Sequence, residues 1–118
     1  MNPSEYIIAS ARTKSNTFRP KTLKQDTIHG ASGLASESGE LMGAIKKAMF
    51  YEQIPDLENI KEEVGDCLWY IARILEAQNW TMEEVMNENI NKLKLRYPDK
   101  FTHENSIERK DKNETKTI

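Results

Sequence analysis

The spacing of apolar residues along the chain predicts a protein made of helices. Apolar positions recur every three or four residues in four stretches, which is the period of an α-helix with one buried side. Prolines at positions 3, 20, 55 and 98 separate these stretches, and proline begins or ends helices rather than continuing them. No stretch has the two-residue alternation or the paired turn signals of a β-sheet. We therefore expect an all-α, four-helix bundle-like fold.

The ends of the four helices follow from their capping residues. In a capping box, a Ser or Thr side chain and a Glu or Gln three residues later satisfy free backbone N–H groups at a helix start. Such boxes stand at Thr22 and Thr81, and Asp56 is also a suitable N-cap. The expected helices are residues 4–14, residues 22–51, a stretch from Asp56 to at least Leu75, and residues 82–97.

The second expected helix contains glycines at positions 30, 33, 39 and 43. Glycine lowers helix propensity by roughly 1 kcal/mol per residue relative to alanine. These glycines are tolerable where they allow a neighbouring helix or a ligand to approach the backbone closely.

Length and composition indicate one domain. A chain of 118 residues, with 37% hydrophobic and 31% charged residues, has room for one hydrophobic core but not for two. We assign residues 1–101 to a single helical domain. Residues 102–118 are polar with balanced charges, and we expect them to form a tail that is mobile or held by a partner.

Charge and cysteine content exclude several classes of function. A net charge of −2 and a pI near 5.7 give no general attraction to nucleic acid. The longest apolar run is about four residues (69–72), far shorter than a membrane span. Cys67 is the single cysteine, which excludes an internal disulfide and fits a reducing cytoplasm. Its place on an apolar helical face predicts a buried, inert thiol.

Two short acidic motifs carry the strongest chemical signal. They are Glu37-Ser38-Gly39-Glu40 and Glu63-Val64-Gly65-Asp66. In each motif two carboxylates are three residues apart, so a helix points them to the same side. Four carboxylates converging between two packed helices would repel one another unless a cation joined them. Mg²⁺ and Mn²⁺ prefer such oxygen ligands, so we interpret the motifs as a metal site.

Polar residues continue the same helical faces. Tyr70 lies four residues after Asp66, and the third helix also carries Arg73. The further polar positions on the second and fourth helices are His29, Lys47, Asn89, Lys92 and Arg96. Carboxylates that hold metals, with nearby cations that neutralise outer phosphates, suit a metal-bound polyphosphate. Each position taken alone is more often a solvated surface residue or part of the core packing than a substrate contact.

These residues together resemble a known family, the MazG-like all-α nucleoside triphosphate pyrophosphohydrolases. The family pattern of E-x-x-E followed by E-x-x-D is present in residues 33–41 and 62–70. Residues 91–98, which read NKLKLRYP, with Phe101, are similar to the end of the family's fourth helix. Residues 5–6 and 11–13 are similar to the opening helix of short, phage-type members. The resemblance covers roughly residues 4–109. Longer members often have a further glutamate where this chain has Ser36.

The resemblance implies a reaction and the residues that carry it. Members hydrolyse a nucleoside triphosphate between the α and β phosphates, using water activated by Mg²⁺ or Mn²⁺, to give a monophosphate and pyrophosphate. Glu37 or Glu40 would orient or deprotonate that water, and the choice stays open. The implied metal ligands are Glu37, Glu40, Glu63 and Asp66, and the implied substrate contacts are Asn89, Lys92 and Arg96, with Lys47, Tyr70 and His29 as further candidates.

The resemblance also implies an assembly and a setting. Members are homo-oligomers, typically tetramers built from dimers, and a small core favours such association. The short architecture resembles bacteriophage-encoded members, which implies a cytoplasmic protein (in the host cytoplasm if it is phage-encoded) that adjusts the nucleotide pool.

Two other classes compete with this interpretation. A ferritin-like di-iron site needs Glu-x-x-His on two helices, and neither His29 nor His103 follows a glutamate at that spacing. A non-catalytic helical module could instead use the acidic face to contact a basic partner protein, or act as a regulatory subunit. For the enzyme, the substrate stays open among damaged nucleotides, dUTP or dCTP, GTP or dGTP, and ppGpp.

Overall fold

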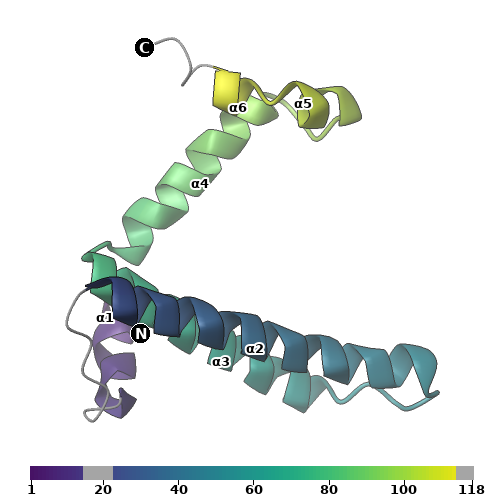
Figure 1. The fold of residues 1–118 in the computed structure, drawn as a ribbon. Coiled ribbons are helices and arrows are strands. Elements are labelled where there is room, and N and C mark those ends of the chain that lie inside the picture. The colour runs from purple at the N-terminus through teal and green to yellow at the C-terminus, as the bar shows by residue number, and fades with distance from the viewer. Residues whose placement is uncertain (15–22, 114–118) are drawn as a thin grey trace. The chain divides into compact units, whose positions relative to one another are not determined.

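The structure, a computed structural model, describes residues 1–14 and 23–113 (Figure 1). In these residues every regular element is a helix, which confirms the all-α fold class. The elements are α1 (Pro3–Ser10), the 3₁₀ helix η1 (Ala11–Thr13), α2 (Leu23–Phe50), α3 (Leu57–Gln78), α4 (Met82–Arg96), α5 (His103–Glu108) and α6 (Lys110–Asn113). They form two compact units, which divide after Thr81. The capping box expected at Thr22 lies outside the described residues.

The starts of α3 and α1 show their capping chemistry directly. The Asp56 side chain accepts a hydrogen bond from the backbone N–H of Asn59 at 3.0 Å, as expected for the N-cap of α3. At the start of α1, Asn2 and Glu5 form a capping box, and Pro3 occupies the first helical position, where its missing N–H costs nothing. Helix α1 therefore begins one residue earlier than expected.

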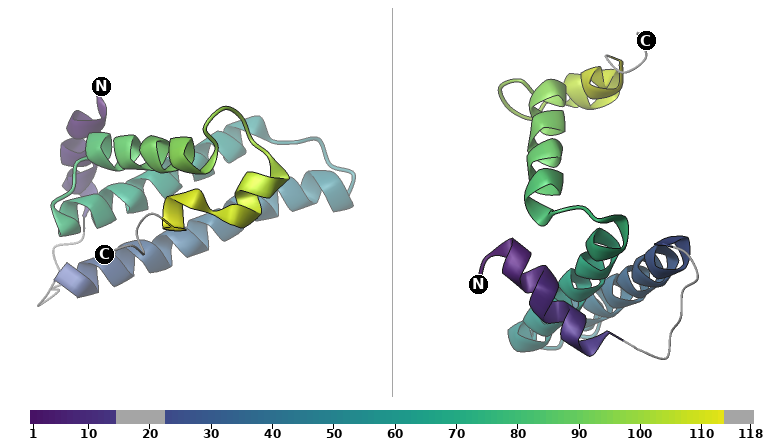
Figure 2. Two further views of the ribbon diagram at one scale, coloured as in Figure 1. Left: turned by 90° about the horizontal axis from the view of Figure 1, so that it is seen from above. Right: turned by 90° about the vertical axis from the view of Figure 1, so that its left-hand side faces the viewer.

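The first unit is built on an antiparallel hairpin of α2 and α3, with α1 lying across α3 (Figures 1 and 2). Two glycines let the hairpin helices approach closely. A Cβ atom on Gly30 would come within 2.7 Å of Ile74 Cγ1, and one on Gly33 would clash with the Tyr70 ring. Close approach is therefore the reason for these two glycines, as the sequence indicated.

The packing of this unit is uneven along the hairpin. Among the described residues, the fully buried apolar side chains are Ala72, Leu75 and Ala77, all in the second half of α3. At the opposite end, near the loop that joins the two helices, Met49, Phe50 and Leu57 are 66%, 65% and 71% exposed. In the described part of this unit, the buried core is thus small and lies where α1 joins the hairpin. Between the two ends, Cys67 is half-buried with a free thiol.

The second unit contains α4, α5 and α6, and one buried carboxylate joins them. Asp111 on α6 accepts two hydrogen bonds from Arg96 on α4, at 3.0 and 3.1 Å, and two longer ones from Arg109. These hydrogen bonds, first those from Arg96, hold the pKa of Asp111 well below its usual range. Part of the segment expected to be a polar tail, residues 103–113, is therefore helical and fixed to α4.

No helix in the described part of the chain is both long enough and apolar enough to cross a membrane.

Candidate metal centre and adjoining pocket

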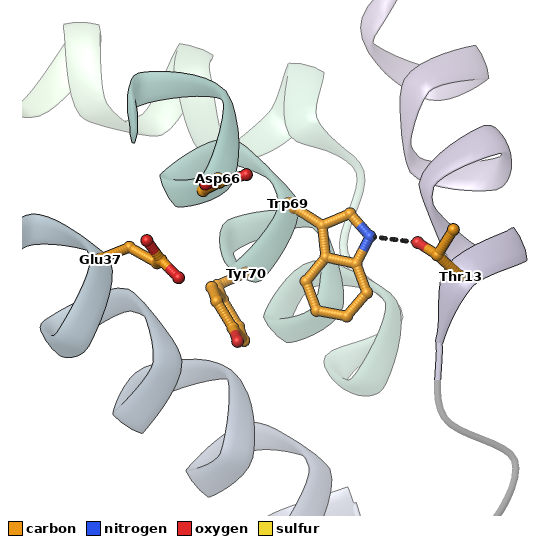
Figure 3. Close-up of a pocket in the computed structure, with 5 residues that line it drawn as sticks. All are labelled: Thr13, Glu37, Asp66, Trp69 and Tyr70. Atoms are coloured by element: carbon orange, nitrogen blue, oxygen red, sulfur yellow. Dashed lines mark hydrogen bonds between the residues drawn. The ribbon is translucent and has the colours of Figure 1, made fainter. Parts of the chain in front are cut away.

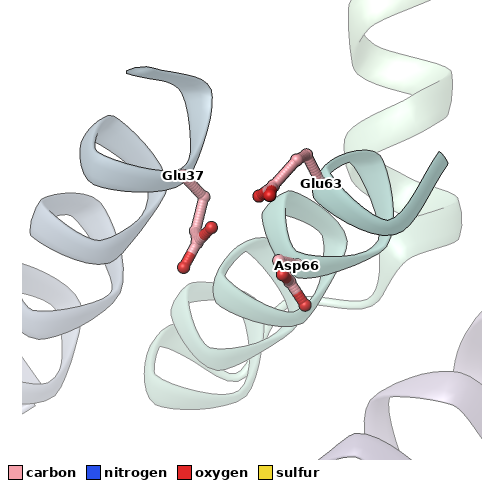
Figure 4. Close-up of side chains that lie close together, drawn as sticks. All are labelled: Glu37, Glu63 and Asp66. Atoms are coloured by element: carbon pink, nitrogen blue, oxygen red, sulfur yellow. The ribbon is translucent and has the colours of Figure 1, made fainter. Parts of the chain in front are cut away.

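Three carboxylates from the two hairpin helices converge on one point. Glu37 comes from α2, and Glu63 and Asp66 come from α3 (Figure 4). One oxygen from each side chain lies within 4.8 Å of the others. The spacing of three residues between Glu63 and Asp66 places both on the helix face that meets α2. The antiparallel packing of α2 then brings Glu37 opposite them.

The electrostatics of this cluster favour a bound cation. The Oε2 atoms of Glu37 and Glu63 are buried and have no hydrogen-bond partner in the described part of the chain. Burial, a proton shared with Glu63, and the charges of Glu40, Asp66 and Glu63 together raise the pKa of Glu37 to about 7. A divalent cation would supply the missing partner for both buried oxygens and remove the repulsion. The donor set is all oxygen, as Mg²⁺ and Mn²⁺ prefer. The residues therefore fit a hard divalent metal ion.

Glu40 is placed differently from the other three motif carboxylates. Its side chain is exposed and is not one of the three that converge. Its charge nevertheless acts on Glu37, because Glu40 is one of the groups that raise the pKa of Glu37. The structure thus brings together three of the four expected ligands, and the role of Glu40 as ligand or catalytic group stays a prediction.

A pocket of about 310 Å³ adjoins the carboxylates (Figure 3). Its lining residues are Thr13, Glu37, Asp66, Trp69 and Tyr70. Two metal-site carboxylates thus share one cavity with two aromatic rings. The sequence predicted Tyr70 at the site, but neither Trp69 nor Thr13. Trp69 stands three residues after Asp66, and this spacing alone places both on one face of α3, so its position beside the carboxylates could have been predicted. The position of Thr13 could not, because its contact with Trp69 joins residues 56 positions apart.

The Tyr70 ring is held between α2 and its neighbours on α3. It packs on Gly33, where a side chain would leave no room. It also meets the rings of His29 and Trp69 edge-to-face, at centroid distances of 6.0 and 5.0 Å. His29, another expected substrate contact, is therefore next to a pocket residue.

The remaining expected substrate contacts are not among the residues that line this pocket. Lys47 is exposed in the last turn of α2. Asn89 and Lys92 are exposed on α4, in the second unit, and Arg96 on the same helix uses its Nε and one terminal nitrogen to bind Asp111. How these groups combine with the carboxylates stays a prediction.

A helical hairpin with facing E-x-x-E and E-x-x-D motifs, and a pocket beside the carboxylates, defines a candidate metal-dependent nucleotide-hydrolysing site. Residues 25–101 match the MazG nucleotide pyrophosphohydrolase domain, and the chain belongs to this metal-dependent family. It is also similar to the Gene 37 protein of Mycobacterium phage L5, with 29% identity over 104 residues that cover 81% of this chain and 89% of the phage protein. No solved structure matches the chain.

Proposed function

We propose that the protein is a nucleoside triphosphate pyrophosphohydrolase, which cleaves between the α and β phosphates to release a nucleoside monophosphate and pyrophosphate. The observation that carries this proposal is the shared cavity, in which Glu37 and Asp66 of the carboxylate cluster face Trp69 and Tyr70. Carboxylates suit a metal ion that binds phosphate oxygens, and aromatic rings suit the nucleoside of the same molecule. Membership of the MazG family supports the reaction type.

In this proposal the carboxylates have two roles, to hold the metal ion and to orient the attacking water. Glu37, Glu63 and Asp66 hold the metal ion, for which Mg²⁺ is the first candidate and Mn²⁺ the second. When bound, the metal supplies charge on the phosphate oxygens and lowers the pKa of water. Glu37 or Glu40 orients the water that attacks the α phosphorus and accepts its proton. The pKa of Glu37 is raised to about 7 in the metal-free protein, and a bound cation would lower it, so that Glu37 is ionised when the metal is present.

Cations from the helical surface would neutralise the outer phosphates. Asn89, Lys92 and Arg96 on α4 are our candidates, with Lys47 on α2 as a further one. Arg96 would have to release part of its contact with Asp111, or bind phosphate through its remaining terminal nitrogen.

We also propose that the protein is a homo-oligomer, most simply a tetramer made of two dimers. The support is that each unit exposes large apolar side chains. In the first unit Phe50, Leu57 and Val64 are 65%, 71% and 45% exposed, and on α4 in the second unit Met86 and Ile90 are 51% and 50% exposed. Monomeric proteins rarely leave such patches uncovered. Light scattering coupled to size exclusion would report the mass, and a 13.6 kDa particle would contradict the proposal.

Membership of the MazG family supports a role in adjusting nucleotide pools, and the similarity to a phage protein bears on where that role is carried out. We propose that the enzyme acts in the cytoplasm of the host, where nucleoside triphosphates are made and used, and that it removes selected nucleotides from the pool.

A substrate screen tests the proposed reaction. The purified protein is incubated with a panel of ribo- and deoxynucleoside triphosphates, modified nucleotides and ppGpp, with Mg²⁺, Mn²⁺ or EDTA. Chromatography then separates monophosphate, diphosphate, pyrophosphate and phosphate. We expect monophosphate and pyrophosphate in equal amounts, dependent on metal, from at least one substrate. Release of inorganic phosphate alone would show a different bond cleavage, and inertness toward the whole panel would favour a non-catalytic regulatory module.

A further inference from the structure

The N-terminal segment formed by α1 and η1 is tied to α3 by polar contacts rather than by apolar packing alone. Arg73 on α3 is only 2% exposed, and its guanidinium donates to the backbone oxygen of Ile7 at 3.1 Å and to Ser10 Oγ at 2.6 Å. It also pairs with Glu76 at 2.8 Å, and Glu76 pairs in turn with Lys14 at 2.9 Å. These contacts fix the position of α1 relative to α3, because any displacement would leave the buried charge of Arg73 unpaired.

The same segment holds the indole of Trp69. The indole N–H is shared between the backbone oxygen of Ser10 at 3.0 Å and Thr13 Oγ1 at 2.8 Å. The Thr13 hydroxyl in turn donates to the Ser10 oxygen at 3.3 Å. Arg73 lies over the indole ring, 5.3 Å from its centroid, and the Tyr70 ring meets it edge-to-face.

These contacts determine what the Trp69 side chain can offer a ligand in the pocket. An indole has a single hydrogen-bond donor, and here that donor is already engaged with α1 and η1. The hydroxyl hydrogen of Thr13 is engaged as well. This side of the pocket therefore offers a ligand an aromatic surface without a free side-chain donor. A nucleobase can stack on such a surface whatever its hydrogen-bonding pattern.

We propose that Trp69 is a specificity-determining residue that receives the nucleobase of the substrate by stacking and shape, and that Thr13 and Arg73 are positioning residues that hold its indole in place. This inference rests on the proposed function and extends it. It predicts that the N-terminal segment controls substrate affinity although it contributes no group to the carboxylate cluster.

A fluorescence titration tests whether a base contacts Trp69. The chain has two tryptophans, and Trp80 is half exposed just after α3. A Trp80→Phe variant therefore leaves the Trp69 indole as the only one. We expect nucleoside 5′-monophosphates, added without metal, to quench its emission in a saturable manner, whereas ribose 5-phosphate should not. The matched control is Trp69→Phe, in which the emission of Trp80 should not respond.

Steady-state kinetics test the two positioning residues. Thr13→Val removes the shorter of the two acceptors for the indole N–H and leaves the Ser10 oxygen, whereas Thr13→Ser keeps both. We expect Thr13→Val and Trp69→Leu to raise KM for the preferred triphosphate about tenfold, within the range found for loss of base stacking, with kcat changed less than twofold. Thr13→Ser should restore the wild-type KM. Arg73→Lys should raise KM in the same direction, because lysine cannot reproduce the three contacts of the guanidinium.

The outcomes separate this inference from the function on which it rests. Quenching of Trp69 with the KM effect supports the inference. If nucleotides are hydrolysed while Trp69 emission stays unchanged at saturating substrate, the inference is wrong and the proposed function stands. If Trp69 is quenched by nucleotides but none is hydrolysed, the base contact stands and the proposed reaction is wrong. A fall in kcat in Thr13→Val at unchanged KM would also overturn the positioning role.

Discussion

The two ends of the α2–α3 hairpin differ in how deeply their apolar side chains are buried. At the end where α1 lies, glycines bring the helices together, Ala72 and Leu75 are buried, and Arg73 ties α3 to α1. At the loop end, Met49 and Phe50 stay largely exposed. The carboxylates lie between these ends. The comparison shows that the chain packs one side of the candidate site itself and leaves apolar side chains exposed at the other, where we propose that a second copy binds.

The largest effect is expected from the carboxylates between the two ends. Asp66→Asn should reduce turnover about a thousandfold or more, because a bound metal contributes several kcal/mol to stabilising the transition state. Glu40→Gln should also abolish turnover if the full four-carboxylate pattern of the family applies. The measurement is pyrophosphate release, with circular dichroism to confirm the fold. Glu62→Gln, which neutralises a neighbouring exposed carboxylate outside the cluster, is the matched control and should keep full activity. Normal turnover in purified Asp66→Asn would rule out the assigned site.

The packed end is tested by filling a glycine. Gly33→Ala places a methyl group against the Tyr70 ring, which must move. We expect a loss of about 1–3 kcal/mol in the free energy of unfolding, typical of overpacking. Gly43→Ala, on the same helix, is the control, because in the described part of the chain its Cβ would meet no atom within 4 Å. That variant should be neutral or up to about 1 kcal/mol more stable. Urea denaturation measures both, and equal effects in the two variants would contradict the close contact.

The exposed apolar side chains at the loop end of the hairpin are tested by measuring self-association of the protein. Phe50→Lys should weaken the proposed oligomer about tenfold or more, because it removes apolar area and adds a charge to be desolvated. Gln53→Lys adds the same charge at the same end of the hairpin without removing an apolar side chain. Sedimentation velocity over a concentration series measures both variants. Unchanged association in Phe50→Lys would place the subunit contact elsewhere.

The smallest effect concerns pH. Because the pKa of Glu37 in the folded protein is raised from 4.5 to about 7, the native state holds more protons than the unfolded state between these values. The stability contributed by Glu37 is fully present below pH 4.5 and is lost as the pH rises through 7. The melting temperature of the metal-free protein should therefore fall over this range. Glu37→Gln should flatten that decline, and so should saturating Mg²⁺. A decline that is identical in Glu37→Gln would assign it to other groups.

Much of this architecture was predictable from local patterns. Apolar periodicity and the cap at Asp56 predicted the helices, and the three-residue spacing of Glu63 and Asp66 predicted their shared face, because both depend on near neighbours in the chain. The contacts of Trp69 with Thr13 and of Arg73 with Ser10 join residues 56 and 63 positions apart. No local period encodes such pairs.

The structure of the C-terminal segment also depends on a contact between residues far apart in the sequence. Its polar composition indicated a tail, yet Asp111 is almost fully buried because Arg96, 15 positions earlier, pairs with it. Composition describes the average exposure of a segment, whereas a single ion pair with a distant arginine can order it.

The most direct test of the central claim is a titration of the protein with Mn²⁺, followed by the electron paramagnetic resonance signal of the free ion. We predict saturable binding in the wild type, competition by Mg²⁺, and at least a tenfold weaker site in Asp66→Asn, with Glu62→Gln unchanged. Equal Mn²⁺ binding in the wild type and in Asp66→Asn would contradict a metal centre formed by Glu37, Glu63 and Asp66.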